Sequence, residues 1–142
     1  YIMIRRLTYN DYDSHMKLLA QLSDVGTITK EQFDEFVLSQ NKNFSTLIWE
    51  ENGHEVACIT ILIEKKLIHS GFAVMHIEDV VTHSDFRGKG FCSKLIESAI
   101  NIAKYNCYKI ILNCNDENVE FYTKLGFKRH SNQMRMEVEQ CH

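Results

Sequence analysis

The sequence contains no proline and only six glycines among its 142 residues. Without proline, we expect the chain to turn mainly at glycine, asparagine, aspartate and serine. No apolar run approaches the roughly 20 residues that span a bilayer, and the first residues lack the layout of a signal peptide. We therefore expect a cytoplasmic protein without a membrane span, with targeting to an organelle left open.

The five cysteines and seven histidines show no ligand pattern. There is no C-x-x-C pair, no H-x-x-x-H pair and no Cys/His set with zinc spacing, so the sequence predicts no metal. An odd number of cysteines without a disulfide framework indicates reduced thiols in an intracellular compartment. Cys58 and Cys107 lie in apolar runs, where a thiol packs as a small hydrophobe.

The charge balance is slightly acidic, with 16 basic and 19 acidic side chains and a net charge of −3. This balance does not favour nucleic acid or an anionic membrane as a partner. Hydrophobic residues make up 44% of the chain, which is typical of a globular protein rather than a disordered one. The length fits a single domain over residues 1–142.

Apolar periodicity and turn residues predict an α+β domain with a mixed sheet flanked by helices. Thr29 and Gln32 form a capping box, and Asn52-Gly53 marks a hairpin turn that needs positive φ. Asn115 to Asn118 can cap the last helix, which runs to Lys124. The predicted strands are 1–7, 45–50, 55–64, 73–82, 108–112 and a final region from 127 that ends at 133–138, with helices around 12–22, 33–37, 95–103 and 118–124.

The most informative segment is a basic, glycine-bearing loop between the strand 73–82 and the following helix. The first turn of a helix leaves N–H groups unpaired, and the helix dipole makes that end attractive to anions. The segment is neither a P-loop nor a G-x-G-x-x-G motif, and a glycine-rich turn before a core helix is the simpler alternative. The candidate phosphate-binding residues are Arg87, Gly88, Lys89, Gly90, Phe91, Cys92 and Ser93.

This loop resembles the [QR]-x-x-G-x-[GA] signature of the GNAT acetyltransferases, with Cys92 in place of the usual small residue. Five further segments resemble blocks of the glucosamine-6-phosphate N-acetyltransferases within that superfamily. They are 24–29 (DVGTIT), 64–69 (EKKLIH), 76–81 (HIEDVV), 107–112 (CYKIIL) and 118–127 (NVEFYTKLGF).

The resemblance implies the GNAT fold, a mixed and mostly antiparallel twisted sheet with a splayed central strand pair. It also implies acetyl-CoA as co-substrate, D-glucosamine 6-phosphate as acceptor and a homodimer with shared sites. The product would be N-acetyl-D-glucosamine 6-phosphate, on the way to UDP-N-acetylglucosamine. Direct attack of the sugar amine is favoured over a cysteine-linked intermediate, which would need a thiol of low pKa.

For the cofactor, the resemblance implies that backbone groups of Val80 and Val81 bind the pantetheine arm. Asn118 would hydrogen-bond the cofactor, and the Tyr122 hydroxyl would protonate the departing thiolate. The alternative for Tyr122 is a half-buried aromatic side chain that packs beside Phe121.

For the acceptor, the resemblance implies contacts from Glu78 and Asp79, whose side chains we expect on opposite faces of the strand. Asn113 stands where the family usually has an acid, and an amide cannot accept the amine proton. Water, Glu78, Asp79 or a backbone carbonyl are the alternatives. His76 is expected to be a structural strand histidine. The other proposed substrate contacts are Ser23, Lys66, His69, Tyr108, Lys109 and Arg135, each of which could instead be an ordinary surface group.

Two other functions fit part of the pattern. An acetyltransferase for a peptide or a polyamine would share the cofactor loop, but Lys66, His69 and Lys109 favour an anionic acceptor. A non-catalytic acetyl-CoA-binding module is suggested by Asn113 and opposed by Tyr122. A nucleotide-binding module ranks last, because its motifs are missing.

Overall fold

The computed structural model describes residues 3–140, which form a five-stranded sheet in the order β1-β2-β3-β4-β5. β1 to β4 pair antiparallel and β5 pairs parallel to β4, as expected for a mixed α+β sheet. Tyr1 and Ile2, predicted to begin the first strand, lie outside the described residues. The elements are β1 Ile4–Arg6, α1 Tyr12–Leu19, α2 Lys30–Leu38, β2 Phe44–Glu51, β3 His54–Glu64, β4 Ala73–Thr82, α3 Phe91–Ala103, β5 Cys107–Ile111 and α4 Val119–Lys124.

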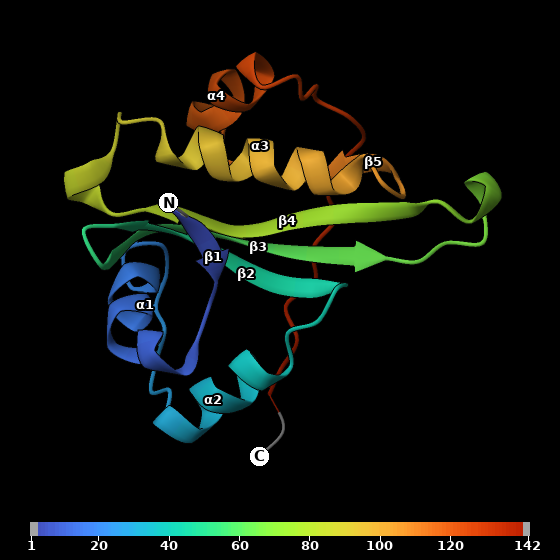
Figure 1. Cartoon of the computed structure of the whole chain (residues 1–142). Coiled ribbons are helices and arrows are strands. Elements are labelled where there is room, and N and C mark those ends of the chain that lie inside the picture. Colours follow the sequence, from blue (N-terminus) through green and yellow to red (C-terminus); the bar gives the residue numbers. More distant parts are fainter. Residues whose placement is uncertain (1–2, 141–142) are drawn as a thin grey trace.

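The helices cover both faces of the sheet, with α3 and α4 on one side and α1 and α2 on the other (Figure 1). Leu95, Ile96 and Ala99 of α3 are fully buried in one core cluster, while Leu18 of α1 and Phe33 of α2 are buried in the second. Burial of each such Leu, Ile or Phe side chain contributes about 1.5–3 kcal/mol, so these contacts fix the helices on the sheet. No helix within residues 3–140 is long and apolar enough to cross a membrane.

Local signals in the sequence are confirmed at two positions. The Thr29 hydroxyl accepts a hydrogen bond from the Gln32 N–H at 3.1 Å, and the Gln32 side chain accepts one from the Thr29 N–H at 2.8 Å. Asn52 and Gly53 both have positive φ, 51° and 81°, as the hairpin requires. The first helix ends at Leu19 rather than at residue 22, because the chain closes there in a tight turn.

Two predictions for the C-terminal part are wrong. Asn115 and Asn118 precede a 3₁₀ turn and α4 as expected, but neither side chain makes a capping hydrogen bond. Residues 127–140 form no strand, and Met134 and Met136 are 89% and 87% exposed. A strand requires a hydrogen-bonded neighbour, and this segment instead runs past the sheet toward the side of α2 (Figure 1).

β4 carries the two irregularities that create a site. Cys58 pairs with Val81 and Thr60 with Glu78, so β4 contains an extra residue at this point, and Asp79 has a φ of 49°. The bulge directs Val80 toward the α3 core and Val81 toward the α1 core. Pairing with β5 stops at His76 and Ile111, so residues 77–82 have no β5 partner. This is the splayed strand pair that we expected.

Candidate active site

The loop after β4 presents an open helix N-terminus. Gly88 and Gly90 have φ of 80° and 82°, and Gly90 is the N-cap of α3. The first helical hydrogen bond runs from the Lys94 N–H to the Gly90 carbonyl at 3.1 Å, so the N–H groups of residues 91–93 have no acceptor within the helix. The first turn contains no acidic residue. This end of α3 is therefore suited to bind an anion such as a pyrophosphate.

Two basic side chains stand at the solvent-exposed edge of this loop. Arg87 Nε donates to the Thr82 carbonyl at 3.3 Å, which ties the loop to the end of β4. Lys89 Nζ lies 5.1 Å from the centre of the Phe86 ring. The Phe91 ring stacks on Trp49 of β2 at 5.0 Å and holds the start of α3 on the sheet. The loop thus combines a fixed backbone with exposed positive charge.

Tyr122 of α4 lies in the same region as the start of α3. It is buried in the α3 core and contacts the Phe121 and Phe127 rings edge-on, at 5.0 Å and 5.9 Å. Burial, followed by the neighbouring thiols of Cys92 and Cys114, raises the pKa of the Tyr122 hydroxyl above its ordinary value. The hydroxyl therefore stays protonated at neutral pH and can donate a proton or a hydrogen bond.

Cys92 at the start of α3 and Cys107 at the start of β5 are poor nucleophiles. Burial raises the pKa of Cys92 to about 11, against a smaller opposing effect of the Thr82 side chain. Burial also raises the pKa of Cys107. Because the thiolate is the reactive form, both groups are almost wholly inert at neutral pH. Cys92 and Cys107 are therefore poorly suited to carry the acetyl group, whereas Cys114, beside Tyr122, is exposed.

On the sheet face opposite α3, a row of charged groups crosses β3 and β4. Glu64 accepts from Lys66 Nζ at 2.9 Å and bonds His76 Nε2 at 2.9 Å. Hydrogen bonds from His76 and then Lys66 lower the pKa of Glu64. His76 and Glu78 line a cleft of about 310 Å³ with Leu62 and Glu64. His76, expected to be only structural, thus lies among the candidate acceptor groups.

A second group of predicted residues gathers where β5 begins. The His69 and Tyr108 rings stack at 4.0 Å, and Lys109 Nζ lies 5.5 Å from the centre of the Tyr108 ring. Lys66 is also close to Tyr108, whose charge contributes to the raised pKa of Lys66 after the larger effect of Glu64. Four of the predicted acceptor residues therefore share one corner of the molecule.

Asn113 and the Glu78–Asp79 pair flank the splay. Ile111 is opposite His76 in the parallel register, so Asn113 would stand beside Glu78 if the pairing continued. All three side chains are exposed. The predicted alternation of Glu78 and Asp79 is interrupted, because Asp79 lies in the bulge. Asn118 is exposed at the start of α4.

Two predicted residues are not brought to this corner. Ser23 follows α1, whose core contacts are at the Cys58–Val81 end of the strands, whereas Lys66 and His69 lie beyond the other end of β3. Arg135 lies in the exposed C-terminal segment and pairs with Glu137 at 2.5 Å. Within one chain, neither contributes to the Lys66–Tyr108 corner.

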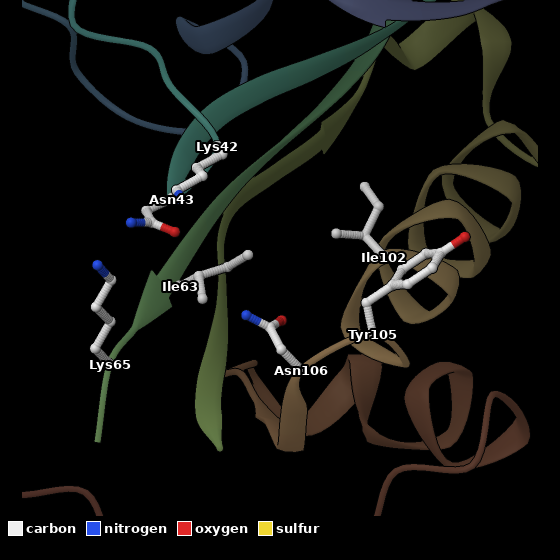
Figure 2. Close-up of a pocket in the computed structure, with 7 residues that line it drawn as sticks. All are labelled: Lys42, Asn43, Ile63, Lys65, Ile102, Tyr105 and Asn106. Carbon is white, nitrogen blue, oxygen red and sulfur yellow. The ribbon is translucent and has the colours of Figure 1, made fainter. Parts of the chain in front are cut away.

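A separate cleft of about 340 Å³ lies near the C-terminal end of α3 (Figure 2). Lys42 and Lys65 project at its rim, and Ile63 and Ile102 line its apolar part (Figure 2). It contains none of the predicted site residues.

One buried polar pair was not predicted from the sequence. His15 Nδ1 of α1 lies 2.5 Å from Glu55 Oε2 of β3, with side-chain exposures of 5% and 0%. The two residues are 40 positions apart, so no short motif joins them. The sequence offered one signal for this pair, which is the position of the acidic Glu55 at the start of an otherwise apolar strand.

Comparison with known proteins identifies the pattern. The profile of the Acetyltransferase (GNAT) family matches residues 9–127. Glucosamine 6-phosphate N-acetyltransferase of Arabidopsis thaliana is 38% identical over 138 residues, which cover 92% of this chain and 93% of that enzyme. The Candida albicans enzyme of the same name is 38% identical over 134 residues, 87% of each chain.

Solved structures agree with this relationship. The crystal structure of the Arabidopsis thaliana enzyme superposes with a TM-score of 0.89 at 36% identity, covering 96% of this chain and 97% of that one. A Trypanosoma brucei acetyltransferase gives the same TM-score at 31% identity, covering 95% and 98%.

Proposed function

Because the chain belongs to the acetyltransferase (GNAT) family, we propose that it transfers the acetyl group of acetyl-CoA to the amine of D-glucosamine 6-phosphate. The main support for this substrate is the 38% identity, over about nine-tenths of both chains, to an enzyme named for this activity. The product is N-acetyl-D-glucosamine 6-phosphate, a precursor for UDP-N-acetylglucosamine. We propose that residues 1–142 act as one domain and that the transfer itself uses no metal.

Acetyltransferases of this family use acetyl-CoA, and the α3 loop is suited to its pyrophosphate. The N–H groups of residues 91–93, with Arg87 and Lys89, supply donors and charge for the phosphates. The free edge of β4 at Val80 and Val81 supplies backbone groups for the pantetheine arm. Asn118, whose side chain caps nothing, is available to the cofactor from α4.

We assign the stretch of β4 from the splay back to the Lys66–Tyr108 corner to the sugar. Lys66 and Lys109 supply positive charge for the 6-phosphate, and the His69–Tyr108 stack lies beside them. Glu78, Asp79 and Asn113, which flank the splay, would contact the hydroxyls and the amine. Ser23 and Arg135 would reach the sugar only from a second copy of the chain.

In the proposed reaction, the neutral amine attacks the thioester carbonyl directly. The C–N bond forms, the C–S bond breaks, and Tyr122 donates a proton or hydrogen bond to the leaving thiolate. A backbone N–H of β4 stabilises the developing oxyanion. The amine proton passes to Glu78, directly or through water, since Asn113 cannot accept it.

We also propose a homodimer. Met134, Met136 and Val138 alternate along an exposed, extended segment and are 89%, 87% and 73% exposed. Such a row of apolar side chains is suited to add to the sheet of a second copy. The arrangement would complete each acceptor site with residues of both chains.

An acetyl-transfer assay read by mass spectrometry tests the proposed function. Acetyl-CoA is supplied with glucosamine 6-phosphate, glucosamine or a short peptide in separate reactions, and the enzyme is weighed without acceptor. We expect acetylated glucosamine 6-phosphate and no acetyl-enzyme. If only the peptide were acetylated, glucosamine 6-phosphate would be the wrong acceptor, although membership of the family would stand. Bound acetyl-CoA without transfer to any acceptor would favour the non-catalytic module and identify Asn113 as a disabling residue.

A further inference from the structure

A cluster of three potential metal ligands lies within the core between the sheet and α1. His15 comes from α1, and Glu55 and Cys58 come from β3. All three are buried, and their ligand atoms lie within 4.8 Å of one another. Neither the proposed acetyl transfer nor the acceptor corner uses these side chains.

The cluster has an unsatisfied acceptor. Glu55 Oε2 bonds His15 Nδ1, whereas Glu55 Oε1 is fully buried and has no partner within the described residues. An unpartnered buried carboxylate oxygen is costly and rare in folded proteins. A cation bound beside Glu55 would give this oxygen the partner that it lacks.

We propose that His15, Glu55 and Cys58 bind one thiophilic divalent transition-metal ion, with Zn²⁺ as the reference ion, at a structural site. A neutral imidazole, a carboxylate and a thiolate together carry two negative charges, which one divalent cation neutralises. Imidazole and thiolate ligands exclude Mg²⁺ and Ca²⁺ as preferred ions. Glu55 Oε1 gains a partner if the carboxylate binds through both oxygens.

The separations permit this with a small movement. Ligand atoms around tetrahedral zinc stand roughly 3.3–3.8 Å apart, given bond lengths of about 2.0–2.3 Å. The His15 Nδ1–Glu55 Oε2 distance of 2.5 Å must widen by about 1 Å as the ion replaces the shared hydrogen. Cys58 Sγ, 3.7 Å from the Asp79 carbonyl, would then give up its proton to the solvent.

Metal titration of the purified full chain, freed of metal with a chelator, tests the proposal. Co²⁺ is the spectroscopic probe, and Zn²⁺ is the competitor. We expect one Co²⁺ per chain, a thiolate-to-cobalt charge-transfer band and its loss on addition of Zn²⁺. Cys58→Ser should abolish the band and weaken metal binding by more than roughly 100-fold. Loss of a residue that only hydrogen-bonds a metal ligand typically costs roughly 10- to 100-fold.

Cys107→Ser is the matched control, because Cys107 is half-buried on β5 and should leave the band unchanged. Circular dichroism of the metal-free variants checks their folding. The chemical shift of bound cadmium reports a sulfur ligand in the unaltered chain, so the test does not depend on the variants. Absence of a stoichiometric ion, equal binding by Cys58→Ser, or a cadmium shift without sulfur would overturn the proposal.

Discussion

The ring of His69 stacks on the ring of Tyr108 at a centroid distance of 4.0 Å and an interplanar angle of 23°. His69 belongs to the 3₁₀ turn that precedes β4, and Tyr108 belongs to β5. Both His69 and Ser70 have positive φ, an unfavourable conformation that the stack helps to hold. The stack therefore positions the turn that follows Lys66 against the edge strand.

Lys66→Ala should raise the KM for glucosamine 6-phosphate about tenfold or more. A hydrogen bond to a charged group contributes about 1.5–3 kcal/mol, and 1.4 kcal/mol is a factor of ten. The rate with unphosphorylated glucosamine should not change. Steady-state kinetics with both acceptors measure the effect, and Lys65→Ala, an exposed neighbour, is the control. An equal loss with both acceptors would contradict a phosphate contact.

Tyr122→Phe should lower kcat by roughly 10²- to 10⁴-fold, the range of general-acid catalysis, with little change in the KM for acetyl-CoA. The substitution retains the ring that packs against Phe121 and Phe127 and removes only the hydroxyl. Pre-steady-state and steady-state rates provide the measurement.

Tyr105→Phe is the matched control for Tyr122, because Tyr105 is 89% exposed and lies away from the splay. Its kcat should equal that of the unaltered enzyme. If Tyr122→Phe retained full kcat, thiolate protonation would have to be assigned elsewhere.

Asp11→Asn should destabilise the fold by about 2 kcal/mol at neutral pH. Asp11 accepts from both terminal nitrogens of Arg5, at 2.8 Å and 2.9 Å, and from the Thr8 N–H at 2.7 Å. Burial alone would raise the pKa of Asp11, but these bonds together lower it. Chemical denaturation at several pH values measures the difference.

The sign of the pH dependence follows from that lowered pKa. The carboxylate contributes stability above the unfolded-state pKa of about 3.9 and loses it as the pH falls through the folded-state value. The gap between wild type and Asp11→Asn should therefore close in acid. Asp13→Asn, at an exposed position, should cost only about 0.5 kcal/mol through the helix dipole. A gap that is constant with pH would contradict the ion pair.

Replacing Met134 and Met136 together by Asp should convert a dimer into a monomer. Charge within this row of apolar side chains opposes its burial against another chain. Size-exclusion chromatography with light scattering measures the mass, and Gln133→Asp adds charge at a neighbouring polar position as a control. A monomeric wild-type chain would contradict the proposed dimer.

Local patterns predicted the elements that depend on near neighbours in the sequence. The bounds of β4 agree with the prediction at 73–82. The strand could be predicted because one apolar stretch of sequence, with polar residues after it, marks it. The bulge at Asp79 could not be predicted, since register depends on how β3 pairs with it. The predicted strand at 133–138 failed for the same reason: its residues have strand propensity but no strand partner among residues 3–140.

The site residues also divide into those that local sequence predicts and those that depend on distant parts of the chain. The loop with Arg87 and Gly90 was recognisable because its function depends on adjacent residues. The His69–Tyr108 stack and the His15–Glu55 pair join distant segments, and only the folded chain reveals them. Ser23 was assigned to the acceptor by resemblance, which does not specify the chain that provides it.

The most direct test of the account is the ratio of kcat/KM for glucosamine 6-phosphate to that for glucosamine, at saturating acetyl-CoA. Two charged contacts to the phosphate, each worth about 1.5–3 kcal/mol, predict a ratio of at least about 100. A ratio near one, or a preference for the unphosphorylated sugar, would contradict both the proposed substrate and the role of the Lys66–Tyr108 corner.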